Sequence, residues 1–101
     1  MFERLAEIEA RYEELTRLLA DPEVLADHRR VEEIARERSQ SEKVVGLYRE
    51  YLEAKQNFTE ARGLMGDADE EMREFGRTEA ERLEAEMARI EHELQIALLP
   101  T

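Results

Sequence analysis

The chain has 101 residues, no cysteine and a formal net charge of −11, with 41% charged and 42% hydrophobic residues. This length supports one small domain, and the lack of cysteine excludes disulfides and thiolate chemistry. The negative charge repels a nucleic-acid backbone, and no apolar run approaches the length of a membrane span, so we expect neither direct nucleic-acid binding nor a membrane partner.

Residues 1 to about 20 are predicted to form an amphipathic helix. Phe2, Leu5 and Ile8 begin an apolar pattern with the three-four spacing of one helix face. On the solvent side, Glu7 and Arg11 stand four residues apart, the spacing of a helical ion pair. The apolar pattern continues through Tyr12, Leu15, Leu18 and Leu19.

Asp21 and Pro22 end this first helix, because the proline ring disfavours a helical conformation at the residue before it. Asp21 can then cap a short turn through Glu23-Val24-Leu25, with Pro22 at its first helical position. Asp27 is the next residue suited to capping a helix. We therefore expect a short turn between two longer helices.

From His28 to about Met65 nothing forbids a second helix. The residues from Arg36 to Glu42 include no large apolar side chain, which leaves a bend or a thinly packed length of helix. We favour thin packing, since this stretch has neither glycine nor proline. The predicted inward positions of the helix are Val31, Ile34, Val45, Tyr48, Leu52, Phe58 and Leu64.

Gly63 and Gly66 suit the end of this helix, where we expect a left-handed backbone. The stretch Asp67-Ala68-Asp69-Glu70 then has the pattern of a cap followed by acids at a helix N-terminus. Gly76 predicts either a slight kink or a close approach of two backbones. The third helix ends before Pro100, and its predicted apolar stripe comprises Met72, Phe75, Ala80, Leu83, Met87, Ile90, Leu94 and Leu98.

Charge is distributed unevenly along the chain. Residues 27–62 hold eight acids and eight bases, whereas residues 67–93 hold eleven acids and four bases. We interpret the basic residues of the middle helix as offsetting neighbouring acids, with contact to phosphate as the alternative. These residues are Arg29, Arg30, Arg36, Arg38 and Lys43.

No residue pattern indicates catalysis, a cofactor or a metal. The Glu-x-x-His motif of carboxylate-bridged metal bundles is absent before both His28 and His92. The glycine pair at 63 and 66 is not followed by the Lys-Ser or Lys-Thr of a phosphate-binding loop. Tyr48 and Tyr51 are expected to pack between helices.

The predicted fold is all-α, with three antiparallel helices in a single domain, 1–101. A long hairpin (about 28–65 and 69–99) carries a shorter N-terminal helix (about 1–20) packed on it. Physical chemistry alone leads to an acidic helical-hairpin module that acts by binding a partner.

The chain resembles the N-terminal domain of bacterial class I peptide chain release factors, type one. The likeness rests on the order and spacing of Asp-Pro-Glu-Val at 21–24, Tyr-Arg-Glu-Tyr at 48–51 and Leu-Leu-Pro at 98–100. It implies the N-terminal fragment of a larger cytoplasmic protein that enters the ribosomal A site at a stop codon and triggers hydrolysis of peptidyl-tRNA. The codon-reading Pro-x-Thr and the catalytic Gly-Gly-Gln of that family are absent here, so no catalytic residue carries over.

The resemblance also implies a contact with the stalk base of the large ribosomal subunit. Antiparallel packing puts the connection between the second and third helices at the end opposite Pro100, so we expect it to make that contact. The candidate residues are Gly63, Gly66, Asp67, Asp69 and Glu70. The alternative is a free-standing coiled-coil adaptor or oligomerisation module that forms homo-oligomers through its exposed apolar stripe.

Overall fold

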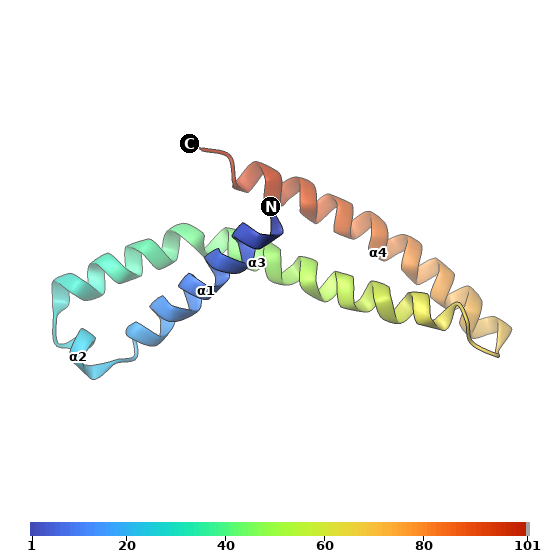
Figure 1. The fold of residues 1–101 in the computed structure, drawn as a ribbon, viewed down its shortest axis with the longest axis horizontal. Helices are drawn as coiled ribbons and strands as arrows, with labels where there is room; N and C mark the ends of the chain where they lie inside the picture. The colour runs from blue at the N-terminus through green and yellow to red at the C-terminus, as the bar shows by residue number, and fades with distance from the viewer. Residues whose placement is uncertain (101) are drawn as a thin grey trace. The chain divides into compact units, whose positions relative to one another are not determined.

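The computed structural model describes residues 1–100, which form four helices and no strand (Figure 1). The all-α prediction is confirmed, and the three long helices end within about two residues of their predicted bounds. The chain divides into two compact units, Met1–Gly46 and a second that begins at Leu47. The helices are α1 Phe2–Leu18, α2 Pro22–Leu25, α3 His28–Leu64 and α4 Glu70–Ala97.

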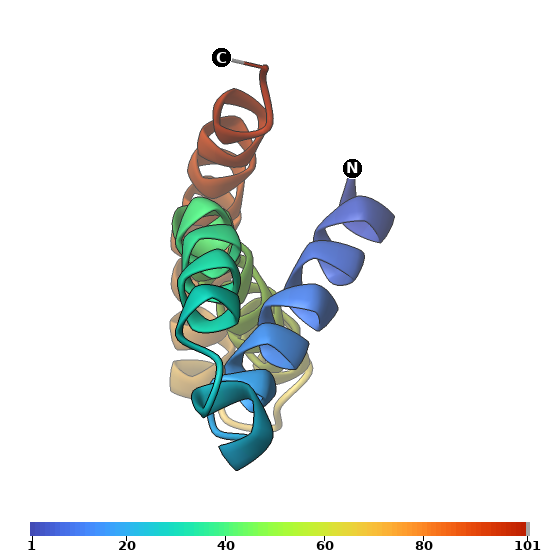
Figure 2. The ribbon, with the colours of Figure 1, turned by 90° about the vertical axis from the view of Figure 1, so that its left-hand side faces the viewer.

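The first unit contains α1, α2 and the first half of α3. Figure 2 shows the short helix α2 at the end where α1 and α3 come together. Leu15, Val24 and Ile34 form a buried cluster there, one residue from each helix. Leu18, Leu19 and Val31 pack against this cluster.

Two aspartates form the corner between α1 and α3, as the sequence predicts. The Asp21 carboxylate accepts a hydrogen bond from the Glu23 amide at 2.9 Å, and Pro22 occupies the first turn of α2. The Asp27 carboxylate accepts one from the Arg30 amide at 3.2 Å, at the start of α3. Each side chain satisfies an amide that a helix start leaves without a backbone partner.

Helix α3 is helical throughout residues 36–42, so this stretch does not end the helix. Polar contacts join α1 to α3 in this stretch. Arg11 donates two hydrogen bonds to the Glu37 carboxylate, at 2.7 and 2.9 Å. The predicted pairing of Arg11 with Glu7 is wrong, because the arginine pairs instead with Glu37 of α3 and, at 3.3 Å, with Glu14 of its own helix.

The second unit is an antiparallel pair made by the second half of α3 and by α4. Gly76 of α4 lies against Ala61 of α3, while Glu91 lies near enough to Tyr51 to affect its ionisation. Residues later in α4 therefore lie beside residues earlier in α3, so the two helices run in opposite directions. The buried residues of this pair are Tyr48, Tyr51, Ala54 and Ala61 of α3 with Gly76, Ala80, Leu83, Ile90 and Leu94 of α4.

The close approach predicted at Gly76 is confirmed. A methyl group on this residue would lie 2.6 Å from the carbonyl oxygen of Ala61 and 2.8 Å from the Cβ of Leu64. Both distances are shorter than van der Waals contact, so only glycine fits between the two helices here. Tyr48 and Tyr51 are buried in the same helix pair, as predicted.

Three predicted inward positions are wrong. Phe75 is 54% exposed, Leu52 is 40% exposed and Met72 is 36% exposed. On α4 the reason is the glycine contact, since two backbones this close leave no space for a phenylalanine between them. The buried face is instead centred on Gly76 and Ala80, and Phe75 is directed to one side of it.

Candidate functional site

The connection between α3 and α4, residues 65–69, is held by short-range hydrogen bonds. The Asp67 carboxylate accepts from the Asp69 amide at 2.8 Å, and the Asp69 carboxylate accepts from the Glu71 amide at 3.0 Å. Asp69 is the N-cap of α4. Two of the five candidate contact residues therefore also hold the turn in shape, which the sequence pattern predicts for a capping stretch.

The expectation of a left-handed glycine at this turn is wrong, because no residue among 1–100 has a positive φ. Gly63 lies inside the last turn of α3, and Gly66 follows the helix in the connection. The Gly66 amide donates to the Gly63 carbonyl at 3.3 Å, and the Asp67 amide donates to the Leu64 carbonyl at 3.0 Å. Right-handed turns of this kind close the helix without an αL residue.

All five candidate residues are exposed and lie within one stretch of eight residues. Glu70 is the first residue of α4 and lies beside the positive end of the helix dipole. We call Gly63, Gly66, Asp67, Asp69 and Glu70 the hairpin tip. Three of these five residues are acidic.

Arg73 bonds to the connection beside the hairpin tip, although the sequence pattern did not indicate this role. Its guanidinium donates to the carbonyl oxygens of Asp67 at 2.8 Å and Ala68 at 3.0 Å. A basic residue in the second turn of an otherwise acidic helix start is the signal that could have identified it. Arg73 fixes the connection against α4 and places one positive charge beside the tip acids.

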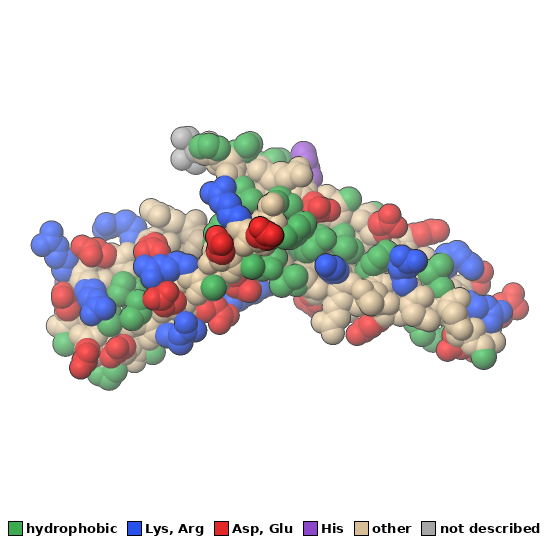
Figure 3. Space-filling view, in the orientation of Figure 1, with side chains coloured by type: hydrophobic (Ala, Val, Ile, Leu, Met, Phe, Trp, Pro, Cys, Tyr) green, Lys and Arg blue, Asp and Glu red, His purple; other side chains and the backbone are tan. Residues whose placement is uncertain are grey.

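Two grooves follow the sides of the hairpin next to the tip. The first, of about 200 Å³, we call the Phe75 groove. The second, of about 340 Å³, has Phe58, Met65 and Ala80 as its apolar part and Arg62 and Arg77 as its basic part. The Phe75 groove is lined by Asn57, Glu60, Ala61, Leu64, Phe75, Glu79, Arg82 and Leu83. Figure 3 shows hydrophobic side chains at the surface of this part of the chain, among acidic and basic ones.

Ion pairs within α4 define the charge of the Phe75 groove. Arg82 donates to the Glu79 carboxylate at 2.9 and 3.2 Å and to the Glu86 carboxylate at 3.3 Å. The hydrogen bond from Arg82 lowers the pKa of Glu79, and the same bond raises the pKa of Arg82. The only arginine of this groove is therefore already neutralised by its neighbours.

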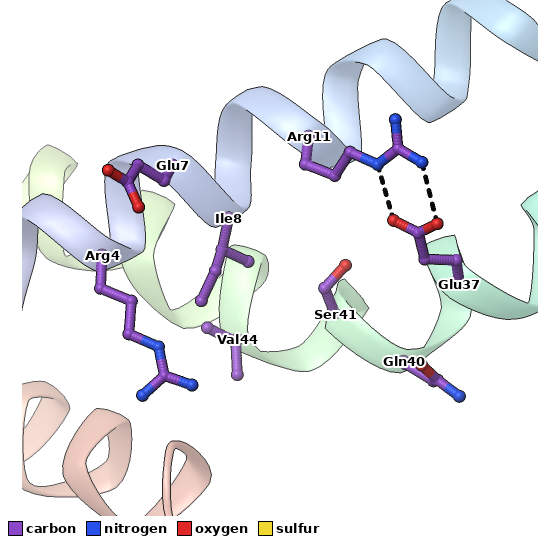
Figure 4. A pocket seen from close by; sticks show the side chains of 8 residues that line it. All are labelled: Arg4, Glu7, Ile8, Arg11, Glu37, Gln40, Ser41 and Val44. Carbon is purple, nitrogen blue, oxygen red and sulfur yellow. Dashed lines mark hydrogen bonds and ion pairs between the residues drawn. The ribbon is translucent and has the colours of Figure 1, made fainter.

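A further groove, of about 430 Å³, lies between α1 and α3 in the first unit (Figure 4). Ile8 and Val44 form its apolar part, and the Arg11–Glu37 pair closes one end. The hydrogen bonds from Arg11 lower the pKa of Glu37. Arg4, Glu7, Gln40 and Ser41 complete the lining. This groove lies beside residues 36–42 of α3, the stretch that has no large apolar side chain.

The structure separates the basic residues of α3 into different environments. Arg29 lies 3.9 Å from Glu33, as expected for a residue that offsets an acid. Arg38 instead lies over the Tyr12 ring and donates to the Thr16 hydroxyl at 2.9 Å. Within the part of the chain that the structure describes, no ion pair joins Arg30, Arg36 or Lys43 to an acid.

Neither histidine lies in an enclosed site. The His28 side chain is 90% exposed and lies 3.3 Å from Glu32, and His92 is exposed on α4. Among residues 1–100, no three histidine, aspartate or glutamate side chains are grouped closely enough to hold a metal ion. None of the helices described is both long enough and apolar enough to cross a membrane.

Comparison with known proteins gives one consistent family. The PCRF domain family matches residues 8–101. Peptide chain release factor 1 of Acidobacterium capsulatum is 43% identical over 100 residues, and that of an Exiguobacterium species is 43% identical over 102 residues. The same-named protein of Listeria welshimeri is 39% identical over 101 residues.

Each of these alignments covers 99% of the chain but only 28–29% of the relative. The chain therefore spans little more than a quarter of the length of the curated relatives it matches. No solved structure matches it significantly. The matched residues include the capped corner at Asp21, the whole of helices α3 and α4 and the hairpin tip, and on this evidence the chain belongs to the PCRF domain family.

Proposed function

We propose that this chain is the non-catalytic N-terminal domain of a cytoplasmic translation termination factor. That factor promotes hydrolysis of peptidyl-tRNA on the ribosome when a stop codon is reached. One observation carries the proposal, namely that proteins named peptide chain release factor 1 align with 99% of the chain at up to 43% identity. The absence of the Gly-Gly-Gln tripeptide from the sequence supports a non-catalytic role.

We propose further that the hairpin tip contacts the stalk base of the large ribosomal subunit. Support comes from its exposure and from the hydrogen bonds that hold the connection in one conformation. A preorganised surface binds without the entropy cost of ordering a flexible loop.

Removing the domain tests the first proposal. The factor that carries this chain is compared with the same factor lacking residues 1–101, in ribosome binding and in single-turnover peptide release at a stop codon. We expect the deletion to weaken ribosome binding while the release rate at saturating factor stays within a few-fold. Hydrolysis of peptidyl-tRNA by the 101-residue chain alone would contradict the proposal, as would unchanged ribosome affinity in the deletion.

Charge-removing substitutions test the tip. Asp67→Asn and Asp69→Asn keep an oxygen that accepts the capping hydrogen bond, and Glu70→Gln removes a third charge without touching a cap. We expect the triple variant to bind ribosomes about tenfold more weakly, which corresponds to ~1.4 kcal/mol. The matched control removes three exposed acids from α3, by Glu42→Gln, Glu50→Gln and Glu53→Gln. An equal effect of both triple variants would show that only net charge matters and would overturn the tip assignment.

The alternative function is a coiled-coil adaptor or oligomerisation module. Exposed apolar side chains such as Phe75 and Ile96, both more than half exposed, favour it. Sedimentation of the chain at micromolar concentration separates the two functions. A monomer with full helicity contradicts obligate self-association, whereas a stable dimer whose formation buries these side chains supports it.

A further inference from the structure

Four polar side chains follow one side of α3 within the first unit. Arg36 and Lys43 stand seven residues apart, about two turns of helix, and Ser39 and Gln40 lie between them. Successive members are three or four residues apart, which places them on one helix face. All four are exposed. We call Arg36, Ser39, Gln40 and Lys43 the α3 polar stripe.

The stripe lies opposite the buried face of this part of α3. Ile34 stands two residues before Arg36, and Val45 stands two residues after Lys43. Both are buried, and two residues correspond to about 200° around a helix. Figure 4 shows the Gln40 side chain directed away from α1. The α3 polar stripe is therefore on the solvent side of the helix.

The two cations of the stripe are not used by the fold. Among residues 1–100, no hydrogen bond or ion pair involves the side chains of the α3 polar stripe. The neighbouring Arg38, in contrast, contacts Tyr12 and Thr16 of α1. Arg36 and Lys43 thus stay unpaired in a chain where 26 acids outnumber 15 bases. Their charges are available to a partner.

The acids of this part of α3 lie outside the stripe. Glu37 is held by Arg11 of α1, and Glu42 lies about 100° around the helix from Lys43. The net charge of −11 opposes an anionic partner at long range, but salt screens charges beyond ~8 Å. Each acid before the stripe has a basic residue one turn earlier, Glu32 near His28 and Glu33 near Arg29.

Resting on the proposed function, we propose that the α3 polar stripe binds the phosphate backbone of an RNA segment of the large ribosomal subunit. Arg36 and Lys43 pair with phosphates, while Ser39 and Gln40 donate hydrogen bonds to phosphate or ribose oxygens. This contact is separate from the hairpin tip, which belongs to the second unit.

The composition of the stripe favours RNA over protein. It contains no aromatic or other apolar side chain, whereas the centre of a protein interface is rich in such residues and depleted in charge. Without an aromatic ring it also has no platform on which a base can stack. The contact therefore positions the RNA backbone and does not read its sequence.

A photocrosslinking experiment with purified large ribosomal subunits identifies the occupant. Because the chain has no cysteine, Ser39→Cys supplies a single attachment point for an azidophenacyl photoprobe. Ala10→Cys is the matched control, since Ala10 is also exposed and lies in α1 of the same unit. We expect the probe at position 39, and not at 10, to give a protease-resistant, RNase-sensitive adduct with ribosomal RNA.

The salt dependence of subunit binding gives the second readout. Arg36→Gln with Lys43→Gln removes both cations of the stripe, whereas Arg4→Gln with Arg17→Gln removes two exposed cations of α1. We expect the stripe variant to bind about tenfold more weakly and the control variant to change less than threefold. The slope of log affinity against log salt should flatten by about 1.5 in the stripe variant alone. Circular dichroism confirms that both variants stay helical.

Failure of the inference and failure of the proposed function give different results. If the chain binds subunits but the probe at position 39 crosslinks only to protein or to nothing, the inference is overturned and the proposed function stands. Equal losses of affinity in the two double variants would show that only net charge matters, and would also overturn the inference alone. If the chain does not bind large subunits at all, the proposed ribosome contact fails and the inference fails with it.

Discussion

The guanidinium carbon of Arg38 lies 4.4 Å from the centre of the Tyr12 ring. The Nε of the same arginine donates to the Thr16 hydroxyl at 2.9 Å, so one side chain of α3 contacts two residues of α1. These contacts lie where α3 has no large apolar residue to offer. Polar and cation–π contacts therefore replace hydrophobic packing along this part of the first unit.

The first prediction concerns Arg38 and Tyr12. Replacing Arg38 by Met keeps the aliphatic stem but removes the planar cation, and we expect the free energy of unfolding to fall by about 0.5–1 kcal/mol. Urea denaturation measures the change. Arg36→Met is the control, because Arg36 is an exposed neighbour on the same helix, and this variant should leave stability almost unchanged.

A double-mutant cycle isolates the pair. If the ring and the cation interact, Tyr12→Leu and Arg38→Met destabilise the chain less in combination than the sum of their separate effects. Strictly additive effects would contradict the interaction.

The second prediction concerns acid stability. Hydrogen bonds from Arg11 lower the pKa of Glu37 from its ordinary value of 4.5, so the folded chain binds this proton less readily than the unfolded chain. The stabilisation is present above pH 4.5 and is lost as the pH falls through the lowered pKa. We expect Glu37→Gln to unfold at a lower temperature than the parent chain at neutral pH, and this difference to vanish in strong acid.

Thermal unfolding at a series of pH values from about 7 to about 2 measures this difference. Glu42→Gln removes an exposed acid from the same helix and serves as the control. A difference between Glu37→Gln and the parent chain that stayed constant across this range would contradict the assignment.

The third prediction compares two glycines that both lie inside helices. In α3, a methyl group on Gly46 would meet no atom within 4 Å, whereas one on Gly76 would lie 2.6 Å from the Ala61 carbonyl oxygen. We expect Gly46→Ala to stabilise the chain by about 0.5–1 kcal/mol through helix propensity. Gly76→Ala should destabilise it by ~1–3 kcal/mol because it overpacks the helix contact.

Chemical denaturation of the two variants shows whether overpacking of the helix contact or the higher helix propensity of alanine dominates at residue 76. Stabilisation by Gly76→Ala would mean that the helices separate at negligible cost and would contradict a tight contact.

The fourth prediction concerns the cap of α4. Asp69→Ala removes the acceptor of the Glu71 amide and should cost about 1 kcal/mol, while Asp69→Asn should cost much less. Hydrogen exchange of the Glu71 amide gives a local measure. It should accelerate in the alanine variant and not in the asparagine variant, and equal acceleration in both would show that charge and not the cap protects it.

The boundaries of the helices could be predicted because local chemistry decides them. Asp21-Pro22, Asp27 and Asp69 each act within three residues of their own position, so their roles follow from the sequence. The uninterrupted course of α3 through residues 36–42 follows in the same way from the absence of glycine and proline.

Contacts between helices were harder to predict. Arg11 has Glu7 four residues away but bonds to Glu37, 26 residues away, because α1 lies alongside α3. Phe75 and Gly76 are adjacent in the sequence. By its distance along the helix from the other apolar residues of α4, either one could lie on the buried face. Hydrophobicity favours Phe75 as the buried residue, whereas the observed close approach requires Gly76.

The candidate site likewise has one part that local chemistry predicts and one part that depends on contacts between helices. The five tip residues could be located from turn and capping chemistry, since the connection is local. The Phe75 groove could not, because it depends on which face of α4 meets α3. A glycine directly beside a large aromatic residue is the pattern that indicates such a groove in a related sequence.

The turns of this protein store no backbone strain. No described residue has a positive φ, and the connections depend instead on aspartate side chains that accept amide hydrogen bonds at positions 21, 27, 67 and 69. An unstrained turn releases no energy when it opens and needs no rare conformation when it closes. The starts of α2, α3 and α4 therefore depend on aspartate side chains, and replacing such an aspartate by a residue without an acceptor removes the hydrogen bond without relieving any strain.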